Sequence, residues 1–314
     1  MPHNDYRLIH AVADKLAPRF QALFVAAINL AKDRTPDLTA ALQFHSSHTV
    51  LRAINLEPVL DRMEKNFRTV YRLIFHRAAN SILRRDQVQK DTLAEFGLSF
   101  DVTNPRAVEW IRRHAAGLLL EVGLESRLAV KTIVERMFAE SIPPDSAARM
   151  IRHVIGLDKR QAHAVVNYAA LQPDNDKVEL YAKRLLRHRA EKIARTESIA
   201  AASGGQQELW LQAREDGLLE HGRAMRQWLV TEDQRLCPIC APIPSFGPVG
   251  LDEPFLTGNG SMVQHPPAHP FCRCATSLVF ANEDGSFPDA PSETPPFAGE
   301  SGPPKRAPLK PPVR

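Results

Sequence analysis

The four cysteines of this 314-residue chain form two close pairs, and this arrangement constrains the fold more than any other feature. Cys237 and Cys240 make a C-x2-C pair, and Cys272 and Cys274 follow after a long loop, with His269 just before them. Thiolates spaced C-x2-C can reach one tetrahedral ion from a single turn, and a second pair can supply the remaining ligands. The spacing therefore predicts a closed structural zinc site, which has no open position for hydrolytic chemistry.

The identity of the four ligands is open at this stage. A single residue separates Cys272 from Cys274, which strains a chelate, so His269 with either of these cysteines is an alternative to the two cysteine pairs. The cysteines could also remain an unmetallated cluster or form two disulfides. We expect no disulfides, because residues 1–14 contain no apolar segment of the kind that directs secretion.

Two short segments on either side of the cysteines have the composition of β-strands. Residues 227–231 and 275–280 are rich in β-branched and aromatic side chains. We expect the two strands to pair, because pairing would bring the two cysteine pairs together at one end. The sequence thus predicts a small zinc-bound β-hairpin module over residues 223–280.

The rest of the chain predicts a mainly α-helical protein, because apolar residues recur three and four positions apart over most of its length. We expect Pro18 to bend or split the first helix, and Ser203-Gly204-Gly205 to end the longest one. The apolar seam from Leu56 to Ile82 should face the core rather than a coiled-coil partner. The expected helices cover residues 6–33, 36–44, 58–85, 104–116, 124–140, 145–154, 159–171, 176–202 and 206–216.

Composition changes along the chain predict four consecutive regions. They are an N-terminal helical region over 1–100, a central helical part over 101–222, the zinc module over 223–280, and a flexible Pro-rich tail over 281–314. The tail contains too little apolar surface to fold alone. No apolar run reaches the length of a membrane span, so we expect no contact with a membrane.

The formal net charge of +4 permits contact with DNA or an acidic partner without demanding it. The basic residues gather on the helix expected over 176–202, where a solvated face is the default interpretation. The turn at Gly156 resembles that of a helix-hairpin-helix, which contacts phosphates through backbone N–H groups. A helix-packing role is the favoured interpretation of this turn.

Four motifs of the sequence stand in one order: Lys192–Glu197 (KIARTE), Trp228–Asp233 (WLVTED), Cys237–Cys240 (CPIC) and Pro266–Cys274 (PPAHPFCRC). Together they resemble the phage Mu F-like family of minor head, or head morphogenesis, proteins, over roughly residues 100–280. The resemblance implies a virion protein present in few copies in the phage head and assembled in the host cytoplasm. Such a protein acts with the portal and capsid proteins during head assembly or DNA packaging, and the resemblance supplies no established catalytic mechanism.

We therefore expect a structural protein and not an enzyme, with no small-molecule substrate and at most non-specific contact with packaged DNA. Residues 1–170 contain no phosphate loop, no H-E-x-x-H and no nucleophile motif. Asp233 is expected to form a turn, and Glu197 to pair with Arg195, Arg235 or Arg273, rather than to act as catalytic bases. Two other classes stay open: a zinc-dependent DNA-binding protein, and a delivered effector enzyme.

Overall fold

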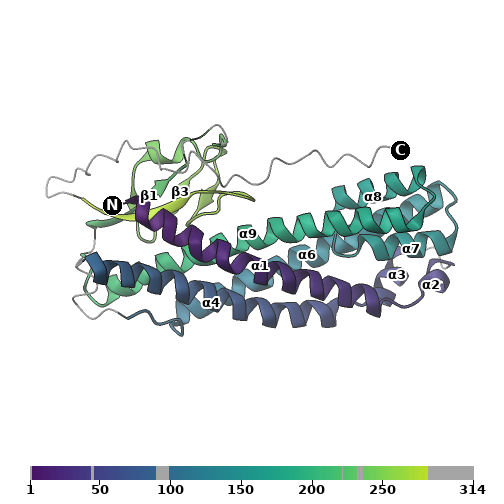
Figure 1. Cartoon of the computed structure of the whole chain (residues 1–314), viewed down its shortest axis with the longest axis horizontal. Helices are drawn as coiled ribbons and strands as arrows, with labels where there is room; N and C mark the ends of the chain where they lie inside the picture. The colour runs from purple at the N-terminus through teal and green to yellow at the C-terminus, as the bar shows by residue number, and fades with distance from the viewer. Residues whose placement is uncertain are drawn as a thin grey trace. The chain divides into compact units, whose positions relative to one another are not determined.

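A computed structural model describes residues 2–43, 46–89, 99–220, 222–231, 233 and 236–281, without the side chains of 2–4, 85–89 and 138. The fold of these residues is mainly helical, with a small sheet region, as the sequence predicts (Figure 1). None of the described helices is long and apolar enough to cross a membrane. The helices are α1 (Pro2–Arg34), α2 (Thr39–Gln43), α3 (Ser47–Ile54), α4 (Glu57–Gln89), α6 (Pro105–Ala139), α7 (Pro144–Val154), α8 (Lys159–Leu171) and α9 (Asn175–Glu215). The tail expected over 281–314 lies outside the described residues, apart from Ala281.

The chain forms two compact units, each built from discontinuous segments. Unit 1 comprises Met1–Pro18, Val70–Ile111 and Lys192–Arg306, and unit 2 comprises Arg19–Thr69, Arg112–Glu191 and Ala307–Arg314. The sheet and all four cysteines belong to unit 1, whereas the described part of unit 2 is helical. The four consecutive regions expected from the sequence stay a prediction.

Unit 2 is held together by apolar side chains from its helices. The rings of Phe20 on α1 and Phe67 on α4 stack with their centroids 4.2 Å apart. The seam expected along α4 does face the core, since its members in unit 2 and in unit 1 are all buried, namely Met63 and Phe67 in the former and Val70, Ile74, Ala78 and Ile82 in the latter. Helices α7 and α8 confirm the expected helices at 145–154 and 159–171, and Asp158 caps α8 in a reciprocal capping box with Gln161.

The turn between α7 and α8 faces the interior of unit 2. Gly156 has φ +82°, and a Cβ at this position would lie 2.5 Å from the side chain of Ile28 on α1. The Gly156 carbonyl accepts a hydrogen bond of 2.8 Å from Arg189, which also pairs with Glu125. Because Ile155, Gly156 and Leu157 are buried, the turn packs inside unit 2.

The expected break at residues 203–205 is wrong, because α9 runs unbroken through Gly204 and Gly205. A Cβ on Gly205 would lie 2.6 Å from the Phe75 backbone oxygen on α4, and one on Gly204 would lie 2.9 Å from the Phe75 ring. The two glycines therefore allow a close helix crossing in unit 1 rather than ending a helix. The packing gained there offsets the low helix propensity of glycine.

Other helix ends also differ from the prediction. The separate helices expected at 104–116 and 124–140 form one helix, α6, because the buried side chains of Leu118, Leu119 and Val122 continue its core-facing stripe between them. Helix α1 likewise continues through Pro18, where neighbouring Leu16 and Phe20 are buried.

Two smaller differences concern a helix start and a surface residue. Helix α2 begins at Thr39 rather than at residue 36. The Asp37 side chain accepts a hydrogen bond from the Thr39 backbone N–H at this helix start. On α9, the apolar spacing of the sequence predicts that Leu180 packs on the core with Leu185 and Ile199, yet Leu180 is 66% exposed while the other two are buried.

The sheet confirms the expected strand pairing. Strand β1 (Ala224–Leu229) pairs antiparallel with β5 (Ala275–Phe280), and β2 (Val249–Gly250) pairs with the other edge of β1. Leu229 lies opposite Ala275, so the ends of the strands that lead to the cysteines are adjacent. The remaining elements are a 3-10 helix, η1 (Ile243–Phe246), and a small ribbon of β3 (Phe255–Leu256) and β4 (Met262–Val263).

Candidate metal centre

The five sequence-predicted ligands come together in unit 1. They form two groups with potential ligand atoms within 4.8 Å of one another: Cys237, Cys240 and His269 in one, and Cys240, Cys272 and Cys274 in the other. Cys240 belongs to both groups. The Cys237 Sγ lies 3.0 Å from the His269 Nε2, and the Cys240 Sγ lies 3.8 Å from the Cys272 Sγ. A single ion with four ligands must therefore draw on both groups.

The first ligand pair sits on a tight turn. The backbone N–H of Cys240 and that of Ala241 both donate to the Cys237 carbonyl, at 3.1 and 3.0 Å. Gly258 braces this turn through a hydrogen bond of 2.8 Å from its N–H to the Ile239 carbonyl. A Cβ on Gly258 would lie 2.2 Å from the Pro238 oxygen, so only glycine allows this approach.

The second ligand turn is held by hydrogen bonds from two directions. His269 Nδ1 lies 2.9 Å from the Pro270 carbonyl, an arrangement in which Nδ1 carries the proton and Nε2 is free to face Cys237. The Cys272 N–H donates to the His269 carbonyl at 3.1 Å. Between them Phe271 has φ +60°, and its N–H donates to Thr196 Oγ1 on α9 at 3.3 Å. The ligand turn is thus tied to the longest helix.

Hydrogen bonds within the cluster shift the pKa values of its thiols in opposite directions. Hydrogen bonds from the Cys240 and Cys274 thiols lower the pKa of Cys272, whereas the same contact with Cys272 raises the pKa of Cys240. Hydrogen bonding to Cys272 raises the pKa of His269 to about 9. Without an ion, hydrogen bonds from neighbours that keep their protons therefore favour the thiolate form of Cys272. A divalent cation would replace those protons.

The spacing of the donor atoms suits a metal with tetrahedral coordination. Two sulfurs bound to one zinc at about 2.3 Å each lie roughly 3.8 Å apart in a tetrahedron. The Cys240 and Cys272 sulfurs have this separation. The Cys237 sulfur and the His269 nitrogen would have to move apart to about 3.5 Å on metal binding. All four cysteines are free thiols, so the structure contains no disulfide between them.

A polar frame surrounds the cluster. Tyr6 on α1 contacts Thr231 Oγ1 at 2.9 Å, and Thr231 donates to the Arg273 carbonyl at 3.4 Å. The Asp233 carboxylate pairs with the Arg273 guanidinium through two hydrogen bonds of 2.6 and 2.7 Å. This bidentate pair raises the pKa of Arg273 and joins the chain before the first ligand pair to the second ligand turn.

Glu197 has a partner that the sequence did not predict. The Tyr71 hydroxyl on α4 donates to Glu197 Oε2 at 2.6 Å, and burial raises the pKa of Tyr71 well above its ordinary value. Tyr71 therefore remains a hydrogen-bond donor. Of the three arginines expected near Glu197, Arg195 lies 4.0 Å from Asp14, Arg273 pairs with Asp233, and Arg235 lies outside the described residues.

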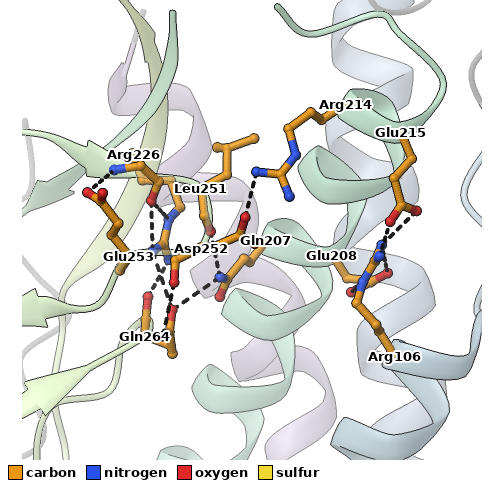
Figure 2. Close-up of polar contacts among 11 residues, drawn as sticks. Arg106, Gln207, Glu208, Arg214, Glu215, Arg226, Leu251, Asp252, Glu253 and Gln264 are labelled. Atoms are coloured by element: carbon orange, nitrogen blue, oxygen red, sulfur yellow. Dashed lines mark hydrogen bonds and ion pairs between the residues drawn. The ribbon is translucent and has the colours of Figure 1, made fainter. Parts of the chain in front are cut away.

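Sequence analysis missed Arg226, a fully buried arginine on β1 (Figure 2). Its guanidinium donates to the backbone carbonyls of Gly250, Glu253 and Gln264, and it lies 5.0 Å from the centroid of the Phe255 ring. Burial lowers its pKa to about 10. The side chain thus holds the loops around the β3–β4 ribbon to the main sheet, and only its position in an alternating strand could have suggested burial.

Figure 2 also shows how α9 contacts the same loops. Gln207 donates to the Leu251 carbonyl at 3.0 Å, and Arg214 pairs with Asp252 at 2.6 Å. Further along, Arg106 at the start of α6 bonds to both Glu208 and Glu215. The α9 segment within unit 1 therefore contacts both the β-rich part and a neighbouring helix.

Comparison with known proteins found no match among family models, curated proteins or solved structures.

Proposed function

We propose that this chain is a phage minor head protein of the Mu F-like type, acting with portal and capsid proteins during head assembly or DNA packaging. The supporting observation is the contact network among the four ordered motifs. Thr196 of the first motif accepts from Phe271 of the last, while Thr231 and Asp233 of the second bond to Arg273 of the last. Motifs that are far apart in sequence therefore form one frame around the candidate metal centre.

We infer that the ion is zinc, because thiolate and imidazole ligands in a tetrahedral set favour it. Cys240 would be one ligand, and the other three would come from Cys237, His269, Cys272 and Cys274. A closed set of four leaves no position for a bound water, so the ion would supply cross-links between two loops rather than chemistry. This role agrees with the hydrogen bonds that orient both ligand turns.

The proposed work of the protein is assembly rather than catalysis. The Asp233 carboxylate is engaged by Arg273 and the Glu197 carboxylate accepts from Tyr71, so each acidic side chain of the motifs has a contact that stabilises the frame. The basic Pro-rich tail over 281–314 is the segment that we expect to dock in extended form on the portal or inner capsid surface.

The test uses particles of the phage or prophage that encodes this chain. Quantitative mass spectrometry of purified particles should find it in few copies, and complementation with Cys240→Ser should give particles that lack it or heads that fail to mature. Leu256→Ser, at a 42% exposed position in the same region, is the matched control and should be incorporated normally. Absence of the wild-type chain from purified particles would contradict the proposal.

A second set of variants separates assembly from chemistry. Asp233→Asn and Glu197→Gln keep the size of each side chain and a hydrogen-bonding oxygen, so folded variants should still assemble. A folded Glu197→Gln protein that enters particles but has lost function would instead support an enzyme.

A further inference from the structure

A groove between α1 and α4 in unit 1 is lined by basic side chains. It has a volume of about 580 Å³, and its cationic residues include Lys15 on α1 and Arg77 and Arg84 on α4. These three side chains are exposed. None of the described residues that line the groove is acidic. We call it the α1–α4 groove.

The charge of the groove is not neutralised by the chain itself. Within the described residues, no ion pair joins its three cations to an acidic side chain. Asp14, the acidic residue next to the groove on α1, lies 4.0 Å from Arg195 on α9 instead. On α4, the stretch from Val70 to Arg85 contains four arginines and no Asp or Glu. Such a concentration of one sign of charge attracts a polyanion.

We propose that the α1–α4 groove binds the phosphates of a nucleic-acid backbone. Arginine binds phosphate oxygens through a planar set of N–H donors, and lysine binds them as a point charge. Arg77 and Arg84 are separated by two helix turns, or roughly 10.5 Å along α4. One DNA strand carries a phosphate about every 3.4 Å along its axis. The two arginines can therefore contact phosphates about three nucleotides apart.

The uncharged side chains of the groove also suit this ligand. Asn80 donates one amide hydrogen to the His76 carbonyl at 2.8 Å, and its second amide hydrogen can bond to a phosphate oxygen. Half-buried Leu8 and Val12 on α1 form an apolar wall that a sugar ring can contact.

The backbone of the two helices favours a nucleic acid over an acidic peptide. Inside α1 and α4 the backbone N–H and C=O groups bond to one another. The groove therefore offers an extended peptide no partner for its own backbone groups, which need hydrogen bonds. Phosphate oxygens only accept hydrogen bonds, and the cations of the groove supply the donors.

The contacts expected in the groove are made to backbone phosphates, so binding should be independent of base sequence. The choice of duplex DNA as the nucleic acid rests on the proposed function, because a protein of head assembly or DNA packaging meets packaged DNA. DNA binding by the purified chain and its presence in particles are nevertheless separate measurements.

Fluorescence anisotropy of the full-length, metal-loaded chain with a short labelled duplex of mixed sequence tests the proposal. Three neutralised phosphates give a slope of about −2.7 when the logarithm of the association constant is plotted against that of the salt concentration. The dissociation constant should be on the order of 5 µM at about 50 mM salt and weaken about 40-fold by about 200 mM. Absence of binding, or equal affinity for polyglutamate of the same charge, would overturn the proposal.

A matched pair of double variants locates the site. Arg77→Gln with Arg84→Gln removes two of the three charges, so binding at about 50 mM salt should weaken at least tenfold and the slope should fall to about −0.9. Arg184→Gln with Arg187→Gln removes two exposed arginines from α9 in unit 2 and should change the affinity less than about twofold. An equal or larger loss in this control would overturn the assignment to the α1–α4 groove.

A second pair of variants leaves the arginines in place. Ala11 is exposed and lines the groove, so Ala11→Glu adds a negative charge beside the bound phosphates and should weaken binding severalfold. Ala11→Gln has a similar size without the charge and should bind like the wild type. Equal effects of the two variants would contradict the role of charge.

The outcome for particles separates this inference from the proposed function. A wild-type chain that enters particles but does not bind DNA overturns only the inference. A chain that binds DNA through the α1–α4 groove but is absent from particles contradicts only the proposed function.

Discussion

The region that carries the cysteines and unit 2 are stabilised by different interactions. In unit 2, buried aliphatic and aromatic side chains line helices over their whole length, as the Phe20–Phe67 stack illustrates. In residues 224–281, which we call the Cys/His module, the strands are short and the apolar core is a small cluster around Trp228 and Phe255. The β3–β4 ribbon there is held by hydrogen bonds from Arg226 to backbone carbonyls. A hydrophobic core needs many residues, whereas a metal and a buried arginine can order a short segment.

The largest difference in stability between the two regions should follow from the loss of a metal ligand. Cys240 belongs to both ligand groups, so Cys240→Ser should remove metal binding and unfold the module, because metal binding free energy is folding free energy in so small a structure. Hydrogen exchange should show lost protection over residues 224–281 and retained protection in the helices of unit 2. Equal loss of protection throughout the chain would mean that the module and the helices fold as one cooperative unit.

Removal of the buried Arg226 side chain should cause the next largest loss of stability. Arg226→Met keeps the length and apolar contacts of the side chain but leaves three backbone carbonyls without their donor. We expect the free energy of unfolding to fall by about 2–3 kcal/mol. Exchange should rise first in residues 250–264, within the module. A matched control is Arg214→Met, since Arg214 pairs with the 63% exposed Asp252 and should contribute less than about 1 kcal/mol.

Alanine substitutions at glycines of the long helices test which of these glycines are needed for close contact between helices. Gly205→Ala should destabilise unit 1 by about 1–3 kcal/mol, because the new Cβ would collide with the Phe75 backbone. Gly117→Ala on α6 is the control, since its Cβ meets nothing, and it should stabilise the helix by roughly 0.5–1 kcal/mol. Thermal unfolding of each variant and of the wild type measures both changes. A tolerated Gly205→Ala would remove the packing explanation for the unbroken α9.

The smallest expected effect is a pH dependence of the stability of unit 2. Burial lowers the pKa of Lys32 from 10.5 to about 8, so the unfolded chain binds more protons than the folded one between these values. Stability should therefore rise with pH from about 8 to about 10.5, by on the order of 1 kcal/mol after allowance for partial solvent access. Lys32→Met should abolish the rise, and a denaturant titration of both proteins across this range measures it. A rise of equal size in Lys32→Met would assign it to another group.

The sequence predicted the parts of the fold that follow from local spacing. The strand pair beside the cysteines, the core-facing seam of α4, and the capped helices α7 and α8 all depend on residues within a few positions of one another. Helix ends were less predictable. Gly204 and Gly205 usually end a helix, yet here they admit the Phe75 backbone, which is distant in sequence.

The candidate site shows the same limit. The spacing of the cysteines and His269 identified the candidate ligands that the fold brings together, but not the division into two groups that share Cys240. Neither could the sequence reveal that Arg226 is buried against carbonyls, or that Tyr71 bonds to Glu197, because these contacts join segments that only the tertiary fold brings together.

Native mass spectrometry of protein purified without chelator tests the central claim most directly, namely that one closed metal site stabilises the Cys/His module. The account predicts a mass increase of one zinc ion per chain, and loss of that increase in Cys240→Ser. A wild-type chain with no bound metal whose module is nevertheless protected from hydrogen exchange would contradict it.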